Sequence, residues 1–231
     1  MKMRIYGARV CVAIALAIAG CGGGGQSVAS LQGTWSGTVE NPSDALGRIT
    51  LVFDNGGHFT VTSPDGSSTG TAKEEKDNVF SYKLSDGTSG GFMVDDAGNH
   101  AGFVDENFYF GVVQKDASSA LPGFTPPDVV GNWSGMTVEL GSDLSLQRMY
   151  GSSATVSSNG AFSGENEKGS FVGAFADYNP AYGRFRGGAT QGGYSMYVSV
   201  FLTADKSFAA GYGCAKSGTF PADCGFTLWH K

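Results

Sequence analysis

Basic residues, cysteines and helical patterns are scarce in this chain of 231 residues. Lys and Arg number 15 against 21 Asp and Glu, so the net charge is −6. An acidic chain without a cluster of Lys and Arg argues against nucleic acid or anionic lipid headgroups as partners. Beyond residue 20 no segment keeps a 3.6-residue apolar period, so any helix should be short. The sequence therefore argues against a helical bundle and favours strands.

Long apolar runs are scarce too. The apolar run near the N-terminus, Val10–Ala19, spans about 15 Å as a helix, whereas the hydrocarbon core of a bilayer is about 30 Å thick. A membrane-spanning helix therefore fails on length. Lys2, Arg4 and Arg9 accompany the run. A basic segment followed by a short apolar one is typical of a secretory signal.

Ile18, Ala19, Gly20 and Cys21 end the apolar run. This segment resembles the lipobox of bacterial lipoproteins, in which an aliphatic and two small residues precede a lipidated cysteine. The resemblance implies cleavage before Cys21, acylation of that cysteine by palmitate or a similar chain, and an outer-membrane location, since Gly22 rather than Asp follows. Several acyl chains make such anchoring stable. An ordinary signal peptide with a chance cysteine is the alternative.

Few cysteines are left for other roles. Cys11 leaves with the signal and Cys21 is assigned to lipid, so Cys214 and Cys224 remain. We expect a disulfide between them that stabilises the fold by about 3 kcal/mol, as suits an oxidising compartment. A two-thiol metal site is the alternative, but no further cysteine or nearby histidine completes it.

Composition divides the chain into five predicted segments. Residues 22–30 are rich in Gly and Ser, as flexible tethers are, and residues 116–128 carry three prolines, which interrupt strands and helices. Removing residues 1–20 takes away three basic residues and no acidic one, so the mature charge becomes −9. The segments are a signal peptide (1–20), the lipidated cysteine with its tether (21–30), a β module (31–115), a linker (116–128) and a second β module (129–231).

The two β modules repeat each other. Gly33–Gly37 returns as Gly131–Gly135 around a tryptophan, and the closing segment Phe110–Lys115 returns as Phe226–Lys231. Asn-Gly and Asp-Gly pairs between runs of β-branched and aromatic residues indicate tight hairpins. We therefore expect an all-β protein with two tandem antiparallel meanders, each a small barrel or a sandwich. Between the ends, the repeat aligns Phe59 with Phe162, Phe92 with Phe201, and Ala101–Phe103 with Ala210–Tyr212.

The Gly-x-Trp start of each copy resembles that of the calycins, the small barrels that include lipocalins and avidins. The resemblance implies that Trp35 and Trp133 pack across the barrel floors. It also implies that a basic residue of the last strand, Lys115 or Lys231, lies over each ring by cation–π contact. Each copy is shorter than a typical lipocalin, which argues against a roomy ligand cavity.

A catalytic set is not apparent. The segment 87–91 matches Gly-x-Ser-x-Gly at Ser89, but this motif works on a turn from a strand into a helix, and a strand is expected to follow here. His58, His100 and His230 align with Ala161, Ala209 and Gln114 of the other copy, so exposed loop histidines are expected rather than a shared metal or acid–base site.

Acidic clusters lie at residues 95–99 and 105–107. Their oxygens suit calcium, but they lack the EF-hand spacing. We therefore expect these acidic residues to form turns with solvated carboxylates, and a calcium site is the alternative.

The copies differ most where the second one is longer. Aromatic residues alternate there with Arg184 and Arg186, and Tyr178 and Tyr182 lie nearby. Tyrosine and arginine together suit recognition of a partner. These four residues are the candidate binding surface, with ordinary strand core as the alternative.

These patterns favour a non-enzymatic, lipid-anchored protein of the bacterial cell envelope that binds a partner protein or a small ligand, without cofactor or metal. It would sit at the outer membrane, on the periplasmic face or the cell surface. A structural or assembly factor of that membrane is one alternative, and an unrecognised hydrolase is another.

Overall fold

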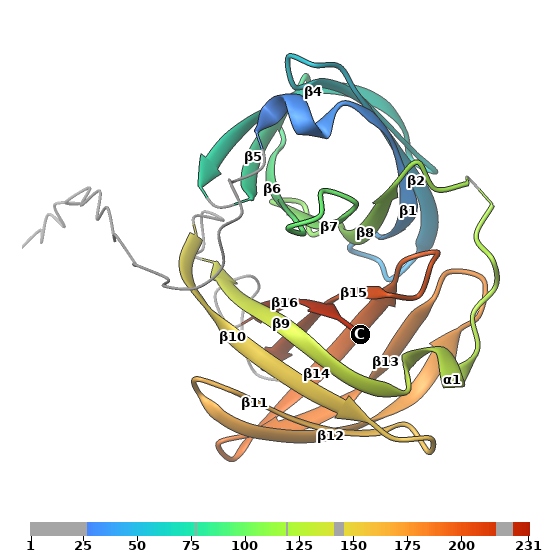
Figure 1. Ribbon diagram of the computed structural model, residues 1–231, viewed down its shortest axis with the longest axis vertical. Coiled ribbons are helices and arrows are strands. Elements are labelled where there is room, and N and C mark those ends of the chain that lie inside the picture. The colour runs from blue at the N-terminus through green and yellow to red at the C-terminus, as the bar shows by residue number, and fades with distance from the viewer. Residues whose placement is uncertain (1–26, 77, 119, 141–145, 216–223) are drawn as a thin grey trace, which may run out of the picture.

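The computed structural model describes residues 27–76, 78–118, 120–140, 146–215 and 224–231. Cys21 and the predicted signal peptide lie outside these residues. Two closed antiparallel β-barrels follow one another along the chain, each with eight strands (Figure 1). The prediction of two tandem all-β meanders is confirmed, and both are barrels rather than sandwiches. In the described part of the chain, no helix has the length and hydropathy needed to cross a membrane.

The first barrel, barrel 1, runs from residue 33 to residue 115. Its eighth strand pairs with its first, with Trp35 opposite Lys115, and this pairing closes the barrel. Phe108 and Tyr109 precede the last strand, in a turn where Phe108 has a φ of 69°. The strands are β1 (Gly33–Glu40), β2 (Leu46–Phe53), β3 (His58–Ser63), β4 (Gly66–Lys76), β5 (Val79–Leu84), β6 (Ser89–Val94), β7 (His100–Asp105) and β8 (Phe110–Lys115).

The second barrel, barrel 2, is closed by pairing between its first and last strands, β9 and β16. Cys214 and Cys224 are opposite each other in neighbouring strands and form the predicted disulfide, which is therefore confirmed. The strands are β9 (Gly131–Leu140), β10 (Leu146–Val156), β11 (Ala161–Asn166), β12 (Gly169–Asn179), β13 (Arg184–Gln191), β14 (Tyr194–Leu202), β15 (Phe208–Ala215) and β16 (Cys224–His230).

A short helix precedes the first strand of each barrel and closes its floor: η1 (Val28–Leu31) in barrel 1 and α1 (Pro126–Val129) in barrel 2. The indole N–H of Trp35 donates to the carbonyl of Leu31 at 2.8 Å. Trp133 donates to the carbonyl of Val129 at the same distance. Both tryptophans are buried. The internal repeat thus extends to the helix that holds each tryptophan.

The last strand of each barrel places a lysine over the tryptophan of the floor. Lys115 Nζ lies 5.7 Å from the ring centroid of Trp35, and Lys231 Nζ lies 5.6 Å from that of Trp133. Each ammonium also donates to a backbone carbonyl of the short helix: Lys115 to that of Ser30, and Lys231 to that of Asp128. The cation therefore ties the last strand to the helix while it covers the ring.

The sequence alignment of the repeat is wrong by one residue around β6 and β14. Val94 pairs with Ala101 in barrel 1, and the equivalent pair in barrel 2 is Leu202 and Ala209. His100 is therefore equivalent to Phe208. A shift of one residue moves a side chain to the opposite face of a strand. Phe92 accordingly packs inside barrel 1, whereas Phe201, its predicted counterpart, packs between the barrels.

The barrels pack against each other through equivalent strands, with β7 and β8 facing β15 and β16 (Figure 1). Three pairs of equivalent residues touch across this interface. The ring of His100 stacks on that of Phe208 at 5.2 Å and 10°, and Phe110 lies 5.8 Å from Phe226. The third pair is Gly102 and Ala210. Contacts between equivalent residues mark a pseudo-twofold axis, as in a symmetric dimer.

Gly102 sets how closely the barrels approach. A Cβ atom at this position would lie 2.9 Å from the Cβ of Ala210 and 2.5 Å from a methyl carbon of Leu228. We expect Gly102→Ala to destabilise the chain by about 1–3 kcal/mol, because overpacking displaces strands that have no free space. Urea unfolding measures this. Gly91→Ala is the control, because its added Cβ would meet only a carbonyl oxygen at 3.4 Å. An equal loss for both variants would contradict the close approach.

Candidate ligand-binding site

Barrel 1 encloses a cavity of about 470 Å³. Alternate residues of a strand point to the same face, so Ile49, Leu51 and Phe53 of β2 all point inward. Sites for small molecules commonly have volumes of about 300–1,000 Å³. The expectation from chain length, which argued against a roomy cavity, is therefore wrong for barrel 1. The apolar wall consists of Val39, Ile49, Leu51, Phe53, Phe59, Val61, Tyr82, Leu84, Phe92 and Phe103.

The cavity lies toward the end of barrel 1 opposite the Trp35 floor. Residues of the β3–β4, β5–β6 and β7–β8 turns line its mouth. One contact spans this mouth: the hydroxyl of Tyr109 donates to Asp65 Oδ2 at 2.9 Å. Tyr109 is also the residue that follows the left-handed Phe108. The turn geometry thus brings a tyrosine from the last hairpin to the rim.

The mouth is acidic. Asp65, Asp86 and Asp105 line it, and none of the residues that line the cavity is basic. Asp105 is only 6% exposed, and burial raises its pKa to about 6, although the N–H groups of Tyr109 and Asn107 donate to its carboxylate. Hydrogen bonds within its own turn lower the pKa of Asp86. The rim is therefore negatively charged at neutral pH.

Barrel 2 has a smaller interior space of about 270 Å³. Trp229 lines it, at the position that Val113 holds in barrel 1. The carboxylate of Glu139 is paired with Lys168 and accepts a hydrogen bond from Tyr150 at 2.7 Å. The interior space of barrel 2 is thus smaller, is lined by a larger side chain and has an ion pair with a half-exposed lysine on its wall.

A third space, a groove of about 650 Å³, lies between the barrels. Val79 and Ser81 line it from barrel 1, and Val138 and Phe226 line it from barrel 2. Its acidic residue, Glu75, pairs with Lys73 at 3.2 Å and accepts from Ser81 at 2.7 Å. The groove therefore presents mainly apolar surface, with its one carboxylate already paired.

The arginines of the predicted binding surface lie in the interface between the barrels. Arg184 Nη1 donates to Glu40 Oε1 at 2.8 Å, and Arg186 forms ion pairs with Glu40 and with Asp44. Glu40 is only 3% exposed and also accepts from the hydroxyl of Tyr212. These guanidinium groups hold barrel 2 to barrel 1 through one buried carboxylate.

The two tyrosines of that surface are placed differently. Tyr178 is exposed and stacks on Phe185 at 6.1 Å. Tyr182 is half-buried, and its backbone carbonyl accepts a hydrogen bond from Thr38 of barrel 1 at 3.0 Å. Recognition of a partner by these residues stays a prediction.

The expectation of exposed loop histidines is wrong for His100. His58 fits it, with a side chain 70% exposed beside Asp54, but His100 is only 8% exposed and sits between two carboxylates. Asp95 and Asp105 do form turns, as expected, but both are buried rather than solvated. The burial of His100, Asp95 and Asp105 could not be predicted from the sequence, because it comes from packing against the second barrel or from the barrel interior.

The Gly-x-Ser-x-Gly match lies on a hairpin. Gly87 has a φ of 98° in the turn after β5, and Ser89 is the first residue of β6. The turn from a strand into a helix that this motif needs is therefore not formed at Ser89.

Fold and cavities together define a tandem β-barrel protein with an apolar, acidic-mouthed cavity in its first barrel. No protein-family model matches the chain, and no curated protein matches it. Solved structures that are similar to it include two of low sequence identity. A protein of unknown function of the DUF3598 family from Nostoc punctiforme is 10% identical, with a TM-score of 0.35 over 89% of this chain and 99% of that one. The haemoglobin receptor HpuA from Kingella denitrificans is 14% identical, with a TM-score of 0.41 over 86% and 82%. At these scores neither similarity assigns the chain to a family.

Asp105 should make stability depend on pH in an unusual direction. Its pKa is about 6 in the folded chain against 3.8 for the free group, so the folded state holds the proton more tightly. Its contribution to the stability of the fold is therefore most favourable below the pKa of the free group and is lost as the pH rises through about 6. We expect the free energy of unfolding of Asp105→Asn to rise relative to that of the parent chain between about pH 4 and pH 7, by at most about 3 kcal/mol.

Urea unfolding of both chains across this pH range measures the gain. The control is Asp86→Asn, because the pKa of the exposed Asp86 is lowered rather than raised. A gain of Asp105→Asn that does not change with pH would show that the buried carboxyl is not the cause.

Proposed function

We propose that this protein is a lipid-anchored, non-enzymatic binding protein of the bacterial envelope. It takes into barrel 1 a small ligand with an apolar body and a cationic or hydrogen-bond-donating end. The observation that carries this proposal is the cavity itself, with its apolar wall and a mouth lined by three aspartates and no basic residue.

The wall determines what the ligand body must be. Aliphatic and aromatic side chains gain nothing from a polar ligand, whereas each apolar Å² they cover contributes about 25 cal/mol. The floor of Trp35 closes the far end, so a ligand enters by the mouth. An elongated apolar group therefore fits with its polar end at the rim.

The mouth determines what the ligand end must be. Burial of the Asp105 carboxylate is unfavourable on its own, as its raised pKa indicates. An opposite charge within about 4–6 Å favours the ionised form. A cationic end thus relieves this cost, whereas an anionic end meets three carboxyl groups.

Features outside the cavity support the envelope location. The lipobox resemblance at Cys21 supports anchoring through lipid, and the Gly-rich residues 22–30 support a tether that leaves the barrels free of the bilayer. The Cys214–Cys224 disulfide suits an oxidising compartment. The Trp–Lys contacts at both floors support a relation to the calycins.

A partner protein that docks on barrel 2 is the second candidate. Val172, Tyr178 and Tyr194 are large apolar residues that remain exposed on β12 and β14. Exposed aromatic residues are common anchors of interfaces. Such docking is compatible with a ligand in barrel 1.

Ligand binding is tested with two probes of equal length, dodecylamine and dodecanoic acid, by calorimetry. At about pH 8 we expect the amine to bind about tenfold more tightly or better, because Asp105 is then ionised. At about pH 5 Asp105 is protonated, so the preference should shrink. Equal affinities at both pH values, or a preference for the acid, would refute the cationic end.

Neighbouring residues of β2 provide the matched variants for this test. Leu51 lines the cavity, whereas Val52 is 50% exposed on the outside. Leu51→Trp should weaken amine binding by more than about tenfold by filling the cavity, and Val52→Trp should leave it unchanged. Equal effects would place the probe outside the barrel.

The anchor is tested by labelling cells with radioactive palmitate. We expect Cys21→Ser to lose the label and to leave the membrane fraction, because the acylated atom is gone. Cys11→Ser is the control, since Cys11 leaves with the signal. Label retained by Cys21→Ser would overturn the lipid anchor.

A further inference from the structure

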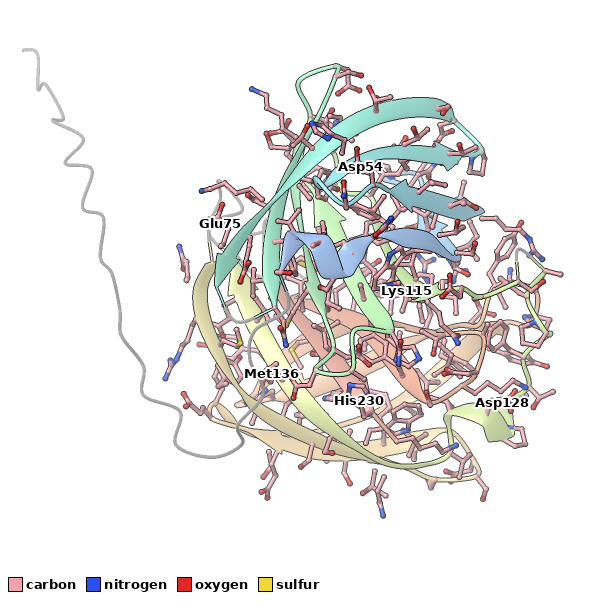
Figure 2. All side chains as sticks on the ribbon, turned by 45° about the horizontal axis from the view of Figure 1, so that its top comes forward. Asp54, Glu75, Lys115, Asp128, Met136 and His230 are labelled. Atoms are coloured by element: carbon pink, nitrogen blue, oxygen red, sulfur yellow. A yellow bond between two sulfur atoms is a disulfide. The ribbon has the colours of Figure 1, made fainter. Side chains whose placement is uncertain are left out.

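Three potential metal ligands from both barrels meet in the interface. Asp95 and His100 come from the turn before β7 and from its first residue, and His230 is the last residue of β16. One ligand atom from each lies within 4.8 Å of the others. Figure 2 places His230 where the two barrels meet.

Asp95 is held so that one carboxylate oxygen is directed at the cluster. Its Oδ1 accepts the N–H groups of Asn99 at 2.7 Å and of His100 at 3.0 Å. Its Oδ2 lies 2.8 Å from Nδ1 of His100. The turn therefore fixes the carboxylate through Oδ1 and directs Oδ2 at the imidazole of His100.

His100 is oriented by a second carboxylate, from barrel 2. Its Nε2 lies 2.8 Å from Oδ2 of Asp205, and Oδ1 of Asp205 accepts from the hydroxyl of Thr203 and the N–H of Ser207. The ring also stacks on Phe208. When Nε2–H donates to Asp205, Nδ1 presents a lone pair toward Asp95. Metal-binding histidines commonly donate their other N–H to a carboxylate in this way.

His230 supplies the open side of the cluster. Its ring is exposed, packs edge-on against Phe208 at 4.9 Å and lies 6.2 Å from the ring of His100. An exposed ligand gives an ion access from solvent, and it leaves room for a bound water.

We propose that Asp95, His100 and His230 bind a divalent first-row transition metal, Zn²⁺ foremost, with Asp205 orienting His100. Two imidazole nitrogens and one carboxylate oxygen are a common zinc donor set, whereas Mg²⁺ and Ca²⁺ prefer oxygen ligands alone. Because the ligands come from both barrels, the metal fastens one barrel to the other.

The chain contains a natural control for this site. Asp54 and His58 form a similar Asp–His pair in a shorter turn: Oδ1 of Asp54 accepts the N–H groups of Gly56 and His58, and Oδ2 lies 3.1 Å from Nδ1 of His58. This pair is exposed, and no second histidine or cysteine of the described residues groups with it. A turn with an Asp–His pair alone should bind zinc only weakly.

The test is calorimetric titration of the full chain with ZnCl₂ after treatment with a chelator. We expect one Zn²⁺ per chain, with affinity about 100-fold lower in His230→Ala and about 10–100-fold lower in Asp205→Asn. His58→Ala should bind as the parent does. No binding by the parent chain, undiminished binding by His230→Ala, or an equal loss in His58→Ala would overturn the site.

Thermal unfolding separates metal binding from a structural role of His230. Because its ring is exposed, the melting temperature of metal-free His230→Ala should stay near that of the parent. Zn²⁺ should raise the melting temperature of the parent and of His58→Ala, since a ligand of the folded state stabilises it, but not that of His230→Ala. A rise of equal size in His230→Ala would contradict the proposal.

Discussion

The close contact between β7 and β15 is the constraint on which the rest of the structure depends. β7 is buried on both faces: one face packs inside barrel 1, and the other packs against barrel 2. This contact requires small or flat side chains where the strands approach, which Gly102, Ala210 and the stacked rings of His100 and Phe208 supply. The Glu40 ion cluster and the Asp95 cluster lie at other points of the same interface, so they exist only while the barrels stay docked. A single geometric requirement thus links stability, the buried charges and the proposed metal site.

The two barrels share their ends but not their interiors. Both have a tryptophan held by a short helix and covered by a lysine. Barrel 1 encloses the larger cavity, whereas the space inside barrel 2 is smaller and is lined by Trp229, at the position that Val113 holds in barrel 1. The shared residues therefore maintain the closed barrel, and the unshared residues decide whether it can hold a ligand. This division favours barrel 1 for small-molecule binding and barrel 2 for support.

Local features could be predicted from the sequence, and contacts between distant segments could not. Turn residues and strand patterns predicted two tandem antiparallel meanders without deciding between barrel and sandwich, and two remaining cysteines predicted the disulfide. The burial of Glu40 could not be foreseen, because its partner Arg184 is 144 residues away. The alignment of β6 with β14 failed because an error of one residue preserves the apolar character of a strand while exchanging its faces. The cavity also escaped prediction, because its size depends on how side chains from several strands pack inside the barrel rather than on chain length.

The pseudo-twofold axis has an evolutionary consequence. In a dimer of identical barrels, every residue on the axis would face its own copy, and both edges of the interface would be the same. Fusion into one chain removes that restriction. A histidine can then face a phenylalanine, as His100 faces Phe208. One edge can acquire the Arg184–Glu40 pair while the other keeps Val79 and Val138 beside an apolar groove. Linkage of the two barrels in one chain thus allows an interface with two equivalent edges to carry two different surfaces, each free to change without altering the other.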